Sequence, residues 1–322
     1  MGNGISVAMA TYNGGEYLAE QLASIAHQEH LPDELVVCDD GSSDGTVGVL
    51  REFAAVAPFP VRLEIHAHNR GSTASFGSAI ARCRGEIIFL ADQDDVWAPQ
   101  KVGRLAEVLA REPGVGFAFS DARLVDAHRR PLGPNLWHVL PFPPAEQARL
   151  NAGKAFDVLL RRNVVAGTTM AFRAEYRRWV LPIPGGWVHD GWLALIISAL
   201  AKAKAVSEPL VEYRQHAGQQ IGARRETLLQ KYRRRKRQGP HFYHATAENY
   251  AYALARLKPL RSTLPDPSVL DALEQKVAHW RARARMRTLA GWRVPMIARE
   301  ILRGSYVRYS AGWKSVAEDF VV

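Results

Sequence analysis

Short apolar runs alternate with stretches of helical periodicity over the first third of the chain. The runs at 5–10, 35–38 and 87–90 carry no charge and are only four to six residues long, which predicts buried β-strands. Residues 61–65 predict a further strand of alternating character. Between these runs and after Pro99, apolar residues recur every three or four positions, as on helices with one buried face. Strands that alternate with helices predict an α/β fold with a mostly parallel sheet flanked by helices.

The pattern is more mixed after residue 115. Strands are expected at 115–120, 164–172 and 210–214, and a helix is expected at 191–201, opened by His189-Asp190. The proline-rich stretch 131–148 is expected to form a loop. From about residue 224 the chain is expected to be helical and very basic. The sequence therefore predicts one α/β domain over 1–222 and a basic helical extension over 223–322.

Polar clusters follow three of the predicted strands. Thr11-Tyr12-Asn13 follows the first strand, Asp39-Asp40 follows the second, and Asp92-Gln93-Asp94-Asp95 follows the run at 87–90. Open α/β sheets bind their ligands beyond the carboxyl ends of the strands. These clusters are therefore expected to lie at a common ligand site.

The cluster Asp92-Gln93-Asp94-Asp95 places three carboxylates within four residues. Such carboxylates repel one another unless a cation or hydrogen-bond donors offset their charge. Oxygen ligands of this kind suit Mg²⁺ or Mn²⁺, which commonly bridge to substrate phosphates. The alternative is a solvated acidic turn in which Asp95 caps the helix after Pro99.

The second cluster, which begins at Asp39, is also a candidate ligand site. Asp39 and Asp40 are predicted ligand contacts, because a carboxylate accepts hydrogen bonds from a base N–H or a ribose hydroxyl. Asp44 is predicted to cap the following helix instead.

Charge is distributed unevenly along the 322 residues. Residues 1–100 carry 5 basic and 14 acidic side chains, and the rest of the chain carries 37 and 18. The acidic half suits a bound cation, and the basic half suits phosphates or an anionic membrane surface.

Cys38 and Cys83 show no metal or disulfide spacing and are expected to be core residues in a reducing compartment. Without a signal peptide or a spanning segment, a cytoplasmic location is expected, with peripheral contact at the inner face of the membrane kept open.

The motifs together resemble the donor half of family 2 glycosyltransferases with the GT-A fold, a Rossmann-like α/β fold. The resemblance rests on Thr11-Tyr12-Asn13, Asp39-Asp40-Gly41-Ser42-Ser43-Asp44-Gly45-Thr46, Asn69-Arg70-Gly71 and Asp92-Gln93-Asp94-Asp95-Val96-Trp97. The form of the last motif is similar to a rhamnosyltransferase-like subgroup. The later motifs Gly167-Thr168-Thr169, His189-Asp190-Gly191-Trp192-Leu193 and Tyr213-Arg214-Gln215-His216 resemble the same subgroup and extend the likeness to about residue 222.

The resemblance implies a role for each matching residue. The contacts to the nucleotide sugar would be Thr11, Tyr12, Asn13, Asp39, Asp40, Arg70, Asp92 and Gln93. Asp94 and His216 would contact a Mn²⁺ or Mg²⁺ ion, and Asp190 would be the catalytic base. Asp95 and Trp192 are further candidates for the site.

The chemistry of sugar transfer agrees with these roles. Displacement of a nucleoside diphosphate needs a cation for the leaving group and a base for the attacking hydroxyl. A single base and in-line attack predict inversion at the anomeric carbon, and the matching family is inverting.

Simpler readings remain open for several residues. Asp190 suits the N-terminus of a helix on electrostatic grounds alone. His216 is also explained as a satisfied histidine, and Trp97, Trp187 and Trp192 are explained as packing.

Three classes of function are compatible with these features. The first is a glycosyltransferase of surface polysaccharide or glycolipid assembly, with a dTDP- or UDP-linked donor and a saccharide or lipid-linked acceptor. The second is a nucleotidyltransferase, which is disfavoured because the loop after the first strand carries no cation for a triphosphate. The third is a non-catalytic sugar- or lipid-binding protein.

The basic run 231–237 is by default a solvated helix face, with contact to an anionic membrane as the alternative. No nucleic-acid partner is expected, since no nucleic-acid-binding motif accompanies the charge.

Overall fold

The computed structural model describes the backbone of residues 4–216 and 228–321. The chain forms two compact units. The first comprises 1–153 and 164–223, and the second comprises 154–163 and 224–322. The predicted boundary between residues 222 and 223 lies outside the described residues.

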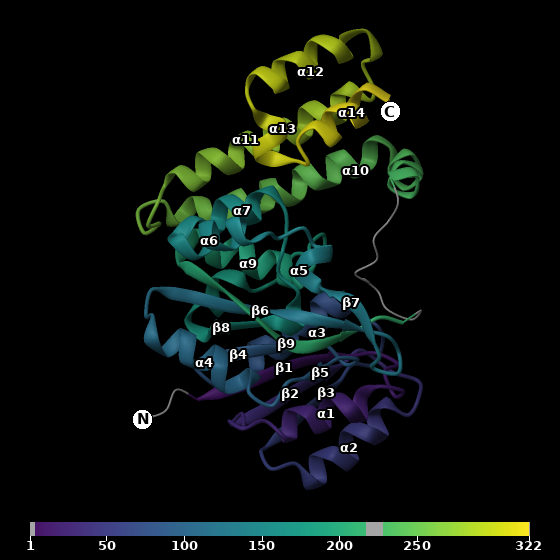
Figure 1. Cartoon of the computed structure of the whole chain (residues 1–322), viewed down its shortest axis with the longest axis vertical. Coiled ribbons are helices and arrows are strands. Elements are labelled where there is room, and N and C mark those ends of the chain that lie inside the picture. Colours follow the sequence, from purple (N-terminus) through teal and green to yellow (C-terminus); the bar gives the residue numbers. More distant parts are fainter. Residues whose placement is uncertain (1–3, 217–227, 322) are drawn as a thin grey trace. The chain divides into compact units, whose positions relative to one another are not determined.

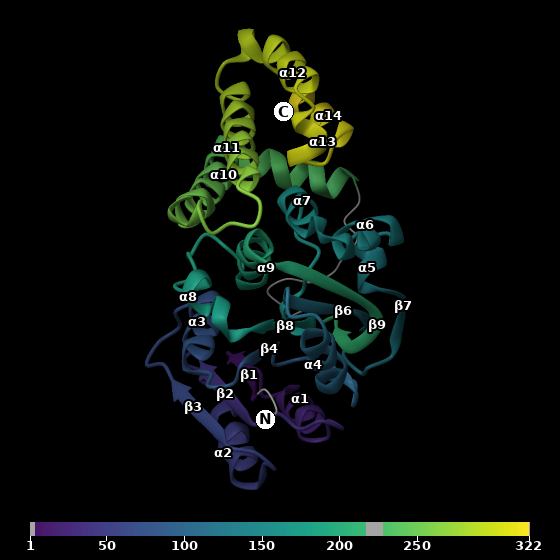
Figure 2. The same cartoon turned by 90° about the vertical axis from the view of Figure 1, so that its left-hand side faces the viewer.

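The first unit is built on a nine-stranded sheet among the described residues, with the order β3-β2-β1-β4-β8-β6-β9-β5 and with β7 paired to β6 (Figure 1). The strands are β1 Ile5–Thr11, β2 Glu34–Asp39, β3 Val61–Ile65, β4 Ile87–Ala91, β5 Val96–Trp97, β6 Val115–Val125, β7 Pro131–Asn135, β8 Met170–Arg173 and β9 Lys202–Arg214. The flanking helices are α1 Leu18–Ala26, α2 Thr46–Val56, α3 Ser72–Arg82, α4 Lys101–Arg111, α5 Leu136–Val139, α6 Pro144–Arg149, α8 Arg177–Val180 and α9 His189–Leu200 (Figure 2). The predicted α/β fold is confirmed.

Four strands of the N-terminal half, β1 to β4, run parallel. Every residue of β1, β2 and β4 is buried, which explains why these segments read as continuous apolar runs. Thr11 pairs in register with Asp39, and Asp39 pairs with Ile65. The carboxyl ends of these strands, and the polar clusters that follow them, therefore meet at one edge.

The other half of the sheet is mixed. β8 lies antiparallel between β4 and β6, whereas β9 runs parallel to β6. The short strand β5 follows the acidic cluster directly and pairs antiparallel with β9, Val96 opposite Glu212. This pairing brings the acidic cluster of 92–95 next to the end of β9 at residues 213–216.

Several predicted boundaries are wrong. The stretch 131–148 forms β7, α5 and α6 instead of a loop, and Pro131 is tolerated because β7 pairs with β6 alone. The predicted strand at 164–172 begins only at Met170, after a short 3-10 turn at Gly167–Thr169. β6 and β9 are longer than predicted because they pair with each other along their length, a contact that no local pattern reports.

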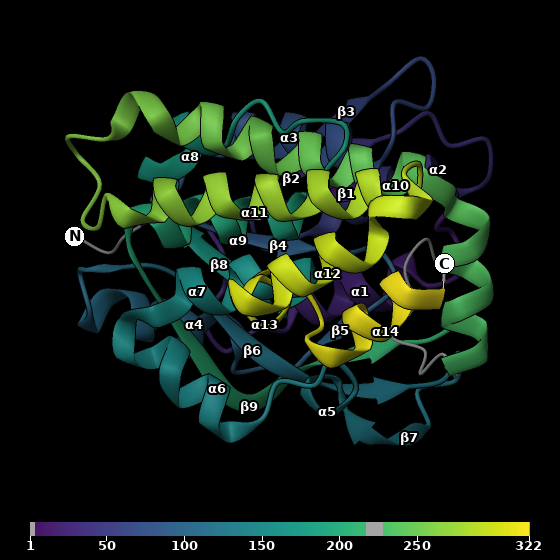
Figure 3. The same cartoon turned by 90° about the horizontal axis from the view of Figure 1, so that it is seen from above.

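The second unit is helical. It contains α7 Ala155–Arg161, α10 Leu228–Leu257, α11 Ser268–Met286, α12 Arg293–Leu302, α13 Ser305–Tyr309 and α14 Trp313–Val321. Figure 3 shows α10 and α11 running side by side. Among the residues described, no helix combines the length and the apolar character needed to cross a bilayer.

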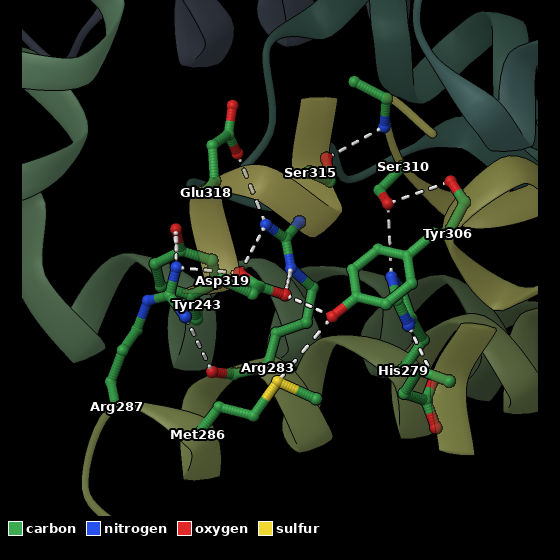
Figure 4. A network of polar contacts seen from close by, with 12 residues as sticks. Tyr243, His279, Arg283, Met286, Arg287, Tyr306, Ser310, Ser315, Glu318 and Asp319 are labelled. Carbon is green, nitrogen blue, oxygen red and sulfur yellow. Dashed lines mark hydrogen bonds and ion pairs between the residues drawn. The ribbon is translucent and has the colours of Figure 1, made fainter. Parts of the chain in front are cut away.

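A buried polar network joins α11, α13 and α14 (Figure 4). Arg283 donates two hydrogen bonds to Asp319, at 2.8 and 2.9 Å, and Tyr306 donates a third at 2.7 Å. His279 bonds to Glu300 at 2.6 Å in the same region. Asp319 and Glu300 are thus buried in this unit.

Candidate functional site

One pocket of the first unit gathers most of the predicted site residues. Its lining includes Thr11, Tyr12, Asp40, Asp92, Gln93, Asp94, Asp190 and His216. These residues follow β1, β2, β4 and β9 or open α9, so segments far apart in the sequence meet at the carboxyl edge of the sheet. This is the position at which open α/β sheets bind ligands.

Asp94 and His216 face each other in this pocket. His216 Nε2 lies 2.9 Å from Asp94 Oδ2, and both side chains are about five-sixths buried, with 15% and 16% exposed. The His216 ring also packs against Tyr17, with the ring centroids 4.6 Å apart. The imidazole is therefore held with one nitrogen on the carboxylate that we predicted as a metal ligand.

The carboxylates of 92–95 are crowded. Burial, followed by the charges of Asp94 and Asp190, raises the pKa of Asp92 to about 7. Burial also raises the pKa of Asp95, with Asp94 and Asp92 as further causes. A bound dication would relieve this repulsion.

Asp95 does not cap α4, and this prediction is wrong. Its side chain is buried, and Oδ1 accepts a hydrogen bond from the backbone N–H of Arg214 at 3.0 Å. Gln100 is the residue at the start of α4, without a side-chain cap. Asp95 instead joins the acidic cluster to the end of β9.

Gln93 is fixed against the loop after β1. Its Oε1 accepts from the Tyr12 N–H at 2.8 Å, and its Nε2 donates to the Tyr12 carbonyl at 3.1 Å. A Cβ on Gly14 would lie 2.3 Å from Gln93 Oε1, so a larger residue at this position would have to displace the amide. The side chain of Gln93 therefore positions the Tyr12 wall of the pocket.

Asp39 and Asn13 connect the loop after β1 to the loop after β2. Asp39 is fully buried, and its Oδ2 accepts from Thr11 Oγ1 at 2.8 Å and from Ser42 Oγ at 2.6 Å. Asn13 Oδ1 accepts from the Ser43 N–H at 2.9 Å. Neither belongs to the described lining of the pocket, so their contribution is to the shape of its loops.

Asp40 lines the pocket and organises the loop after β3. It accepts hydrogen bonds from the backbone N–H groups of Arg70 and Gly71, each at 2.8 Å, and it lies 3.2 Å from His66 Nδ1. Burial acts to raise the pKa of Asp40, but the hydrogen bonds from Arg70, His66, Ser75 and Gly71 together hold it below its usual value. The side chain of Arg70 is exposed and lies outside the described lining, so the contact that the structure shows is made by its backbone.

Asp190 lies in the first turn of α9, after Val188 at the cap position. Its Oδ2 accepts from the Gly167 N–H at 3.1 Å, and its Oδ1 accepts from the Gly191 N–H. Next to it, His189 is buried and stacks on Phe76, with centroids 3.8 Å apart. Burial lowers the pKa of His189 to about 3, so this ring is a neutral wall of the pocket at pH 7.

Trp192 is not a pocket residue, and this prediction is wrong. Its side chain is fully buried, and its indole N–H donates to the Val180 carbonyl at 2.7 Å. It faces the core side of α9, whereas Asp190 at the start of the same helix faces the pocket.

Three further residues in or beside the pocket were not predicted from the sequence. Tyr213 lines the pocket, and burial, with the charges of Asp95 and its neighbours, raises the pKa of its hydroxyl. Arg214 is almost fully buried and donates to the Asp94 carbonyl at 2.7 Å. Lys101 is fully buried, donates to the Thr168 carbonyl at 2.6 Å, and interacts electrostatically with Asp95 and Asp92. The motif that ends in His216 contained the signal for Tyr213 and Arg214, but nothing local marked Lys101.

The sequence profile of Glycosyl transferase family 2 matches residues 6–175, more than half of the chain, and the chain belongs to this family. An uncharacterised glycosyltransferase of Nostoc sp. is 28% identical over 223 residues, which cover 66% of this chain and 65% of that protein. UDP-Glc:alpha-D-GlcNAc-diphosphoundecaprenol beta-1,3-glucosyltransferase WfgD of Escherichia coli is 24% identical over 122 residues, which cover 38% and 47%. The matches thus span less than two thirds of the length of these relatives.

Two solved structures share the fold. Staphylococcus aureus TarS in complex with UDP-GlcNAc aligns with a TM-score of 0.59 and 15% identity, over 86% of this chain and 72% of that one. The mannosyltransferase PcManGT from Pyrobaculum calidifontis, in complex with GDP-Man and Mn²⁺, aligns with a TM-score of 0.54 and 19% identity, over 99% and 85%. At identities this low, the matches show that the chain shares a GT-A-like fold. The assignment to a rhamnosyltransferase-like subgroup stays a prediction.

Proposed function

We propose that this chain is a metal-dependent, inverting glycosyltransferase that moves a sugar from a nucleoside-diphosphate sugar to an acceptor hydroxyl. The observation that carries the proposal is the single pocket lined by Asp92, Asp94, Asp190 and His216. A structural role alone does not require three carboxylates and an imidazole at the carboxyl edge of one sheet. Transfer from a nucleotide sugar does require such a set, because it needs a cation site and a base.

Asp94 and His216 are the residues that would hold Mn²⁺ or Mg²⁺. They offer two protein ligands, which suits an ion that completes its coordination with water and substrate phosphates. The mutual repulsion of Asp92 and Asp94 also favours a cation here. When bound, the ion would stabilise the negative charge that develops on the leaving diphosphate.

Asp190 is the proposed base. The N–H groups of Gly167 and Gly191 fix its carboxylate, and it lines the same pocket as Asp92. The acceptor oxygen would bond to the anomeric carbon as its proton passes to Asp190, and the bond between that carbon and the diphosphate oxygen would break. Attack opposite the leaving group gives inversion.

The nucleoside would contact the Thr11, Tyr12 and Asp40 wall. The Tyr12 ring is 42% exposed and lines the pocket, so a pyrimidine base can stack on it. Stacking alone does not select between bases; UDP- and dTDP-linked sugars are the first donors to test, since the fold neighbour TarS was solved with UDP-GlcNAc. Asp39 and Arg70 would act through the loops that they hold.

Thermal unfolding and transfer assays test the proposal together. Mn²⁺ with UDP or dTDP should raise the melting temperature of the protein, and Asp94→Ala should abolish the shift. Asp190→Asn should keep the shift and lose transfer by at least about a hundredfold. Glu107→Gln removes an exposed carboxylate of the same unit and should leave both unchanged.

Three results would contradict the proposal. Normal turnover by Asp190→Asn would remove the base, and retention of the anomeric configuration in the product would exclude inversion. Stabilisation by a nucleoside triphosphate but by no diphosphate would favour a nucleotidyltransferase.

For the acceptor we propose a saccharide or a lipid-linked saccharide at a membrane surface, in the assembly of a surface polysaccharide or glycolipid. The name of WfgD gives a diphosphoundecaprenol-linked acceptor for that relative. The basic run 231–237 that first suggested membrane contact has no described side chains. A different segment, residues 289–321, now supports this contact.

Apolar side chains are exposed in this segment far more often than in the rest of the chain. Among the residues whose side chains the structure describes, eight of the fifteen exposed large apolar residues lie there, including Trp313 at 73% and Leu302 at 88% exposure. On α12, Val294, Ala298 and Leu302 are all exposed at a spacing of four, next to exposed Arg299. Aromatic and aliphatic side chains beside cations are typical of helices that lie in the membrane interface.

The charges of this segment favour an anionic partner. Arg303, Arg308 and Lys314 are exposed. Of the acids in this segment, Glu300 is buried against His279, Asp319 is buried against Arg283, and Glu318 is 22% exposed and pairs with Arg283 (Figure 4 shows the Arg283 contacts). A cationic surface attracts acidic lipid headgroups and repels a second copy of itself.

Vesicle flotation tests this contact. The protein should float with vesicles that contain phosphatidylglycerol and much less with pure phosphatidylcholine, and salt should weaken the binding. Replacement of both Trp292 and Trp313 by serine should reduce flotation several-fold. Val56→Ser removes an apolar side chain of 80% exposure from the first unit and should have no effect. Unchanged flotation of the double variant, or dimerisation through this surface, would overturn the proposal.

A further inference from the structure

A group of side chains of the kinds that bind metals lies near the end of β3. Cys38 on β2 and Glu64 on β3 are register partners, and His66 follows two positions after Glu64. Because side chains alternate along a strand, these three residues share one face of the sheet. One ligand atom from each lies within 4.8 Å of the other two.

The distances suit a tetrahedral ion. Cys38 Sγ lies 3.2 Å from Glu64 Oε2, and His66 Nε2 lies 3.8 Å from Glu64 Oε1. Zinc bonds of about 2.0–2.3 Å place neighbouring ligand atoms of a tetrahedron about 3.3–3.8 Å apart. The sulfur and the imidazole nitrogen thus lie next to different oxygens of Glu64, while one ligand atom from each residue lies within 4.8 Å of the other two. Rotation of the Glu64 carboxylate that brings Oε2 closer to His66 would complete three of the four corners, which leaves one for water.

His66 is prepared for this role. Its ring is 5% exposed, and within the described part of the chain Nε2 has no hydrogen-bond partner. Its other nitrogen, Nδ1, lies 3.2 Å from Asp40 Oδ1 and 3.5 Å from Ser75 Oγ. If Nδ1 carries the proton and donates it to Asp40, Nε2 presents its lone pair toward Cys38 and Glu64. A carboxylate behind the histidine is the usual support of a metal-bound imidazole.

We propose that Cys38 Sγ, Glu64 Oε2 and His66 Nε2 form a site for a borderline-soft divalent transition metal, for which Zn²⁺ is the best match. A thiolate and an imidazole select Zn²⁺ over the oxygen-seeking Mg²⁺ and Mn²⁺. The site thus differs in chemistry from the pair Asp94 and His216.

Glu64 provides both the entry path and part of the charge balance. Its side chain is 27% exposed, so an ion can enter from this side. Arg82 donates to Glu64 Oε1 at 2.6 Å, which orients the carboxylate and leaves Oε2 for the metal. The thiolate and the carboxylate together neutralise the dication.

The site is coupled to the donor pocket through Asp40. An ion on His66 would fix the imidazole and strengthen its bond to Asp40, which lines the pocket. Occupancy is therefore expected to stiffen the pocket wall that Asp40 organises.

Cobalt substitution is the most direct test. Chelator-treated protein titrated with Co²⁺ should develop a thiolate-to-cobalt charge-transfer band and the visible bands of tetrahedral Co²⁺, and Zn²⁺ should abolish both. Cys38→Ser should lose the charge-transfer band. Cys83→Ser should keep it, because Cys83 Sγ bonds to the Ala79 carbonyl instead. Both thiols are buried, so the two variants differ in geometry and not in burial.

Two further variants separate this site from the others. Asp94→Ala should keep the charge-transfer band, since it alters only the oxygen-rich site. Glu64→Gln, at a partly exposed position, should fold normally and bind Co²⁺ at least about tenfold more weakly. Absence of the band in the wild type, its persistence in Cys38→Ser, or unchanged affinity of Glu64→Gln would overturn the proposal. Circular dichroism of each variant identifies loss of folding, and if Cys38→Ser does not fold, Glu64→Gln decides.

Discussion

Replacement of Arg214 by lysine tests whether the buried guanidinium of Arg214 positions the backbone of Asp94 at the donor pocket. Its side chain is 1% exposed, and its three nitrogens donate in three directions. Nε bonds to the Asp94 carbonyl at 2.7 Å, Nη1 to the Ala127 carbonyl at 2.6 Å, and Nη2 to Glu20 at 2.7 Å. The guanidinium also lies over the Tyr17 ring, 4.6 Å from its centroid.

The expected loss follows from these contacts. A lysine ammonium keeps the charge but cannot span the three acceptors of a planar fork. If it reaches one carbonyl, the other loses a charge-assisted bond worth about 1.5–3 kcal/mol. Glu20 is half exposed, so water replaces its bond at little cost. We therefore expect Arg214→Lys to lower the free energy of unfolding by about 2–3 kcal/mol.

Urea unfolding measures this loss, and Arg129→Lys is the matched control. Arg129 is 44% exposed and pairs with Glu212 at 2.7 Å, close to the same Glu20. An exposed pair of this kind contributes less than about 1 kcal/mol. Arg214→Lys should also weaken the binding of Mn²⁺ with UDP, because Arg214 holds the backbone of Asp94. Equal stability of Arg214→Lys and the wild type, or an equal loss in Arg129→Lys, would refute the reasoning.

Three further perturbations are expected to act on the pocket walls or on the acidic cluster beside them. Gly167→Ala would place a Cβ 2.5 Å from the buried His189 ring and should cost about 1–3 kcal/mol in urea unfolding, together with transfer activity. Gly77→Ala, whose Cβ would approach nothing closer than 3.9 Å, should be neutral or stabilising and serves as its control. Burial lowers the pKa of His189 in the folded protein from 6.5 to about 3. The free energy of unfolding is therefore unaffected by this group above pH 6.5 and decreases as the pH falls below 6.5. At pH 5 the loss should be about 2 kcal/mol, and a His189→Gln variant that keeps the full pH slope would contradict this. Burial lowers the pKa of Lys101, so Lys101→Met is expected to act mainly through the lost hydrogen bond to the Thr168 carbonyl and should cost about 1–3 kcal/mol by the same unfolding assay; unchanged stability would show that Lys101 does not support the acidic cluster.

The acidic cluster of 92–95 shows how far the sequence alone reaches. Its place after an apolar run predicted a strand end, and the order of strands and helices predicted that such ends share an edge. Both inferences depend on local periodicity, which the chain carries along its length. The same reasoning located Asp92 and Asp94 in the pocket but misread Asp95, because the donor that Asp95 binds is the Arg214 N–H.

The sequence could not show which residues far apart along the chain contact each other. The stretch 131–148 read as a loop because its prolines are locally unfavourable, yet β7 forms there by pairing with β6. Lys101 and Arg214 are two of 42 basic residues, and nothing in their neighbours shows that both are buried. Their acceptors, among them the carbonyls of Thr168 and Ala127, lie at other places in the sequence. The sequence by itself determined the α/β fold and the chemistry at the strand ends, since both are encoded by short-range patterns. Only the tertiary structure decided which charges are buried, because burial depends on the other segments that pack around each group.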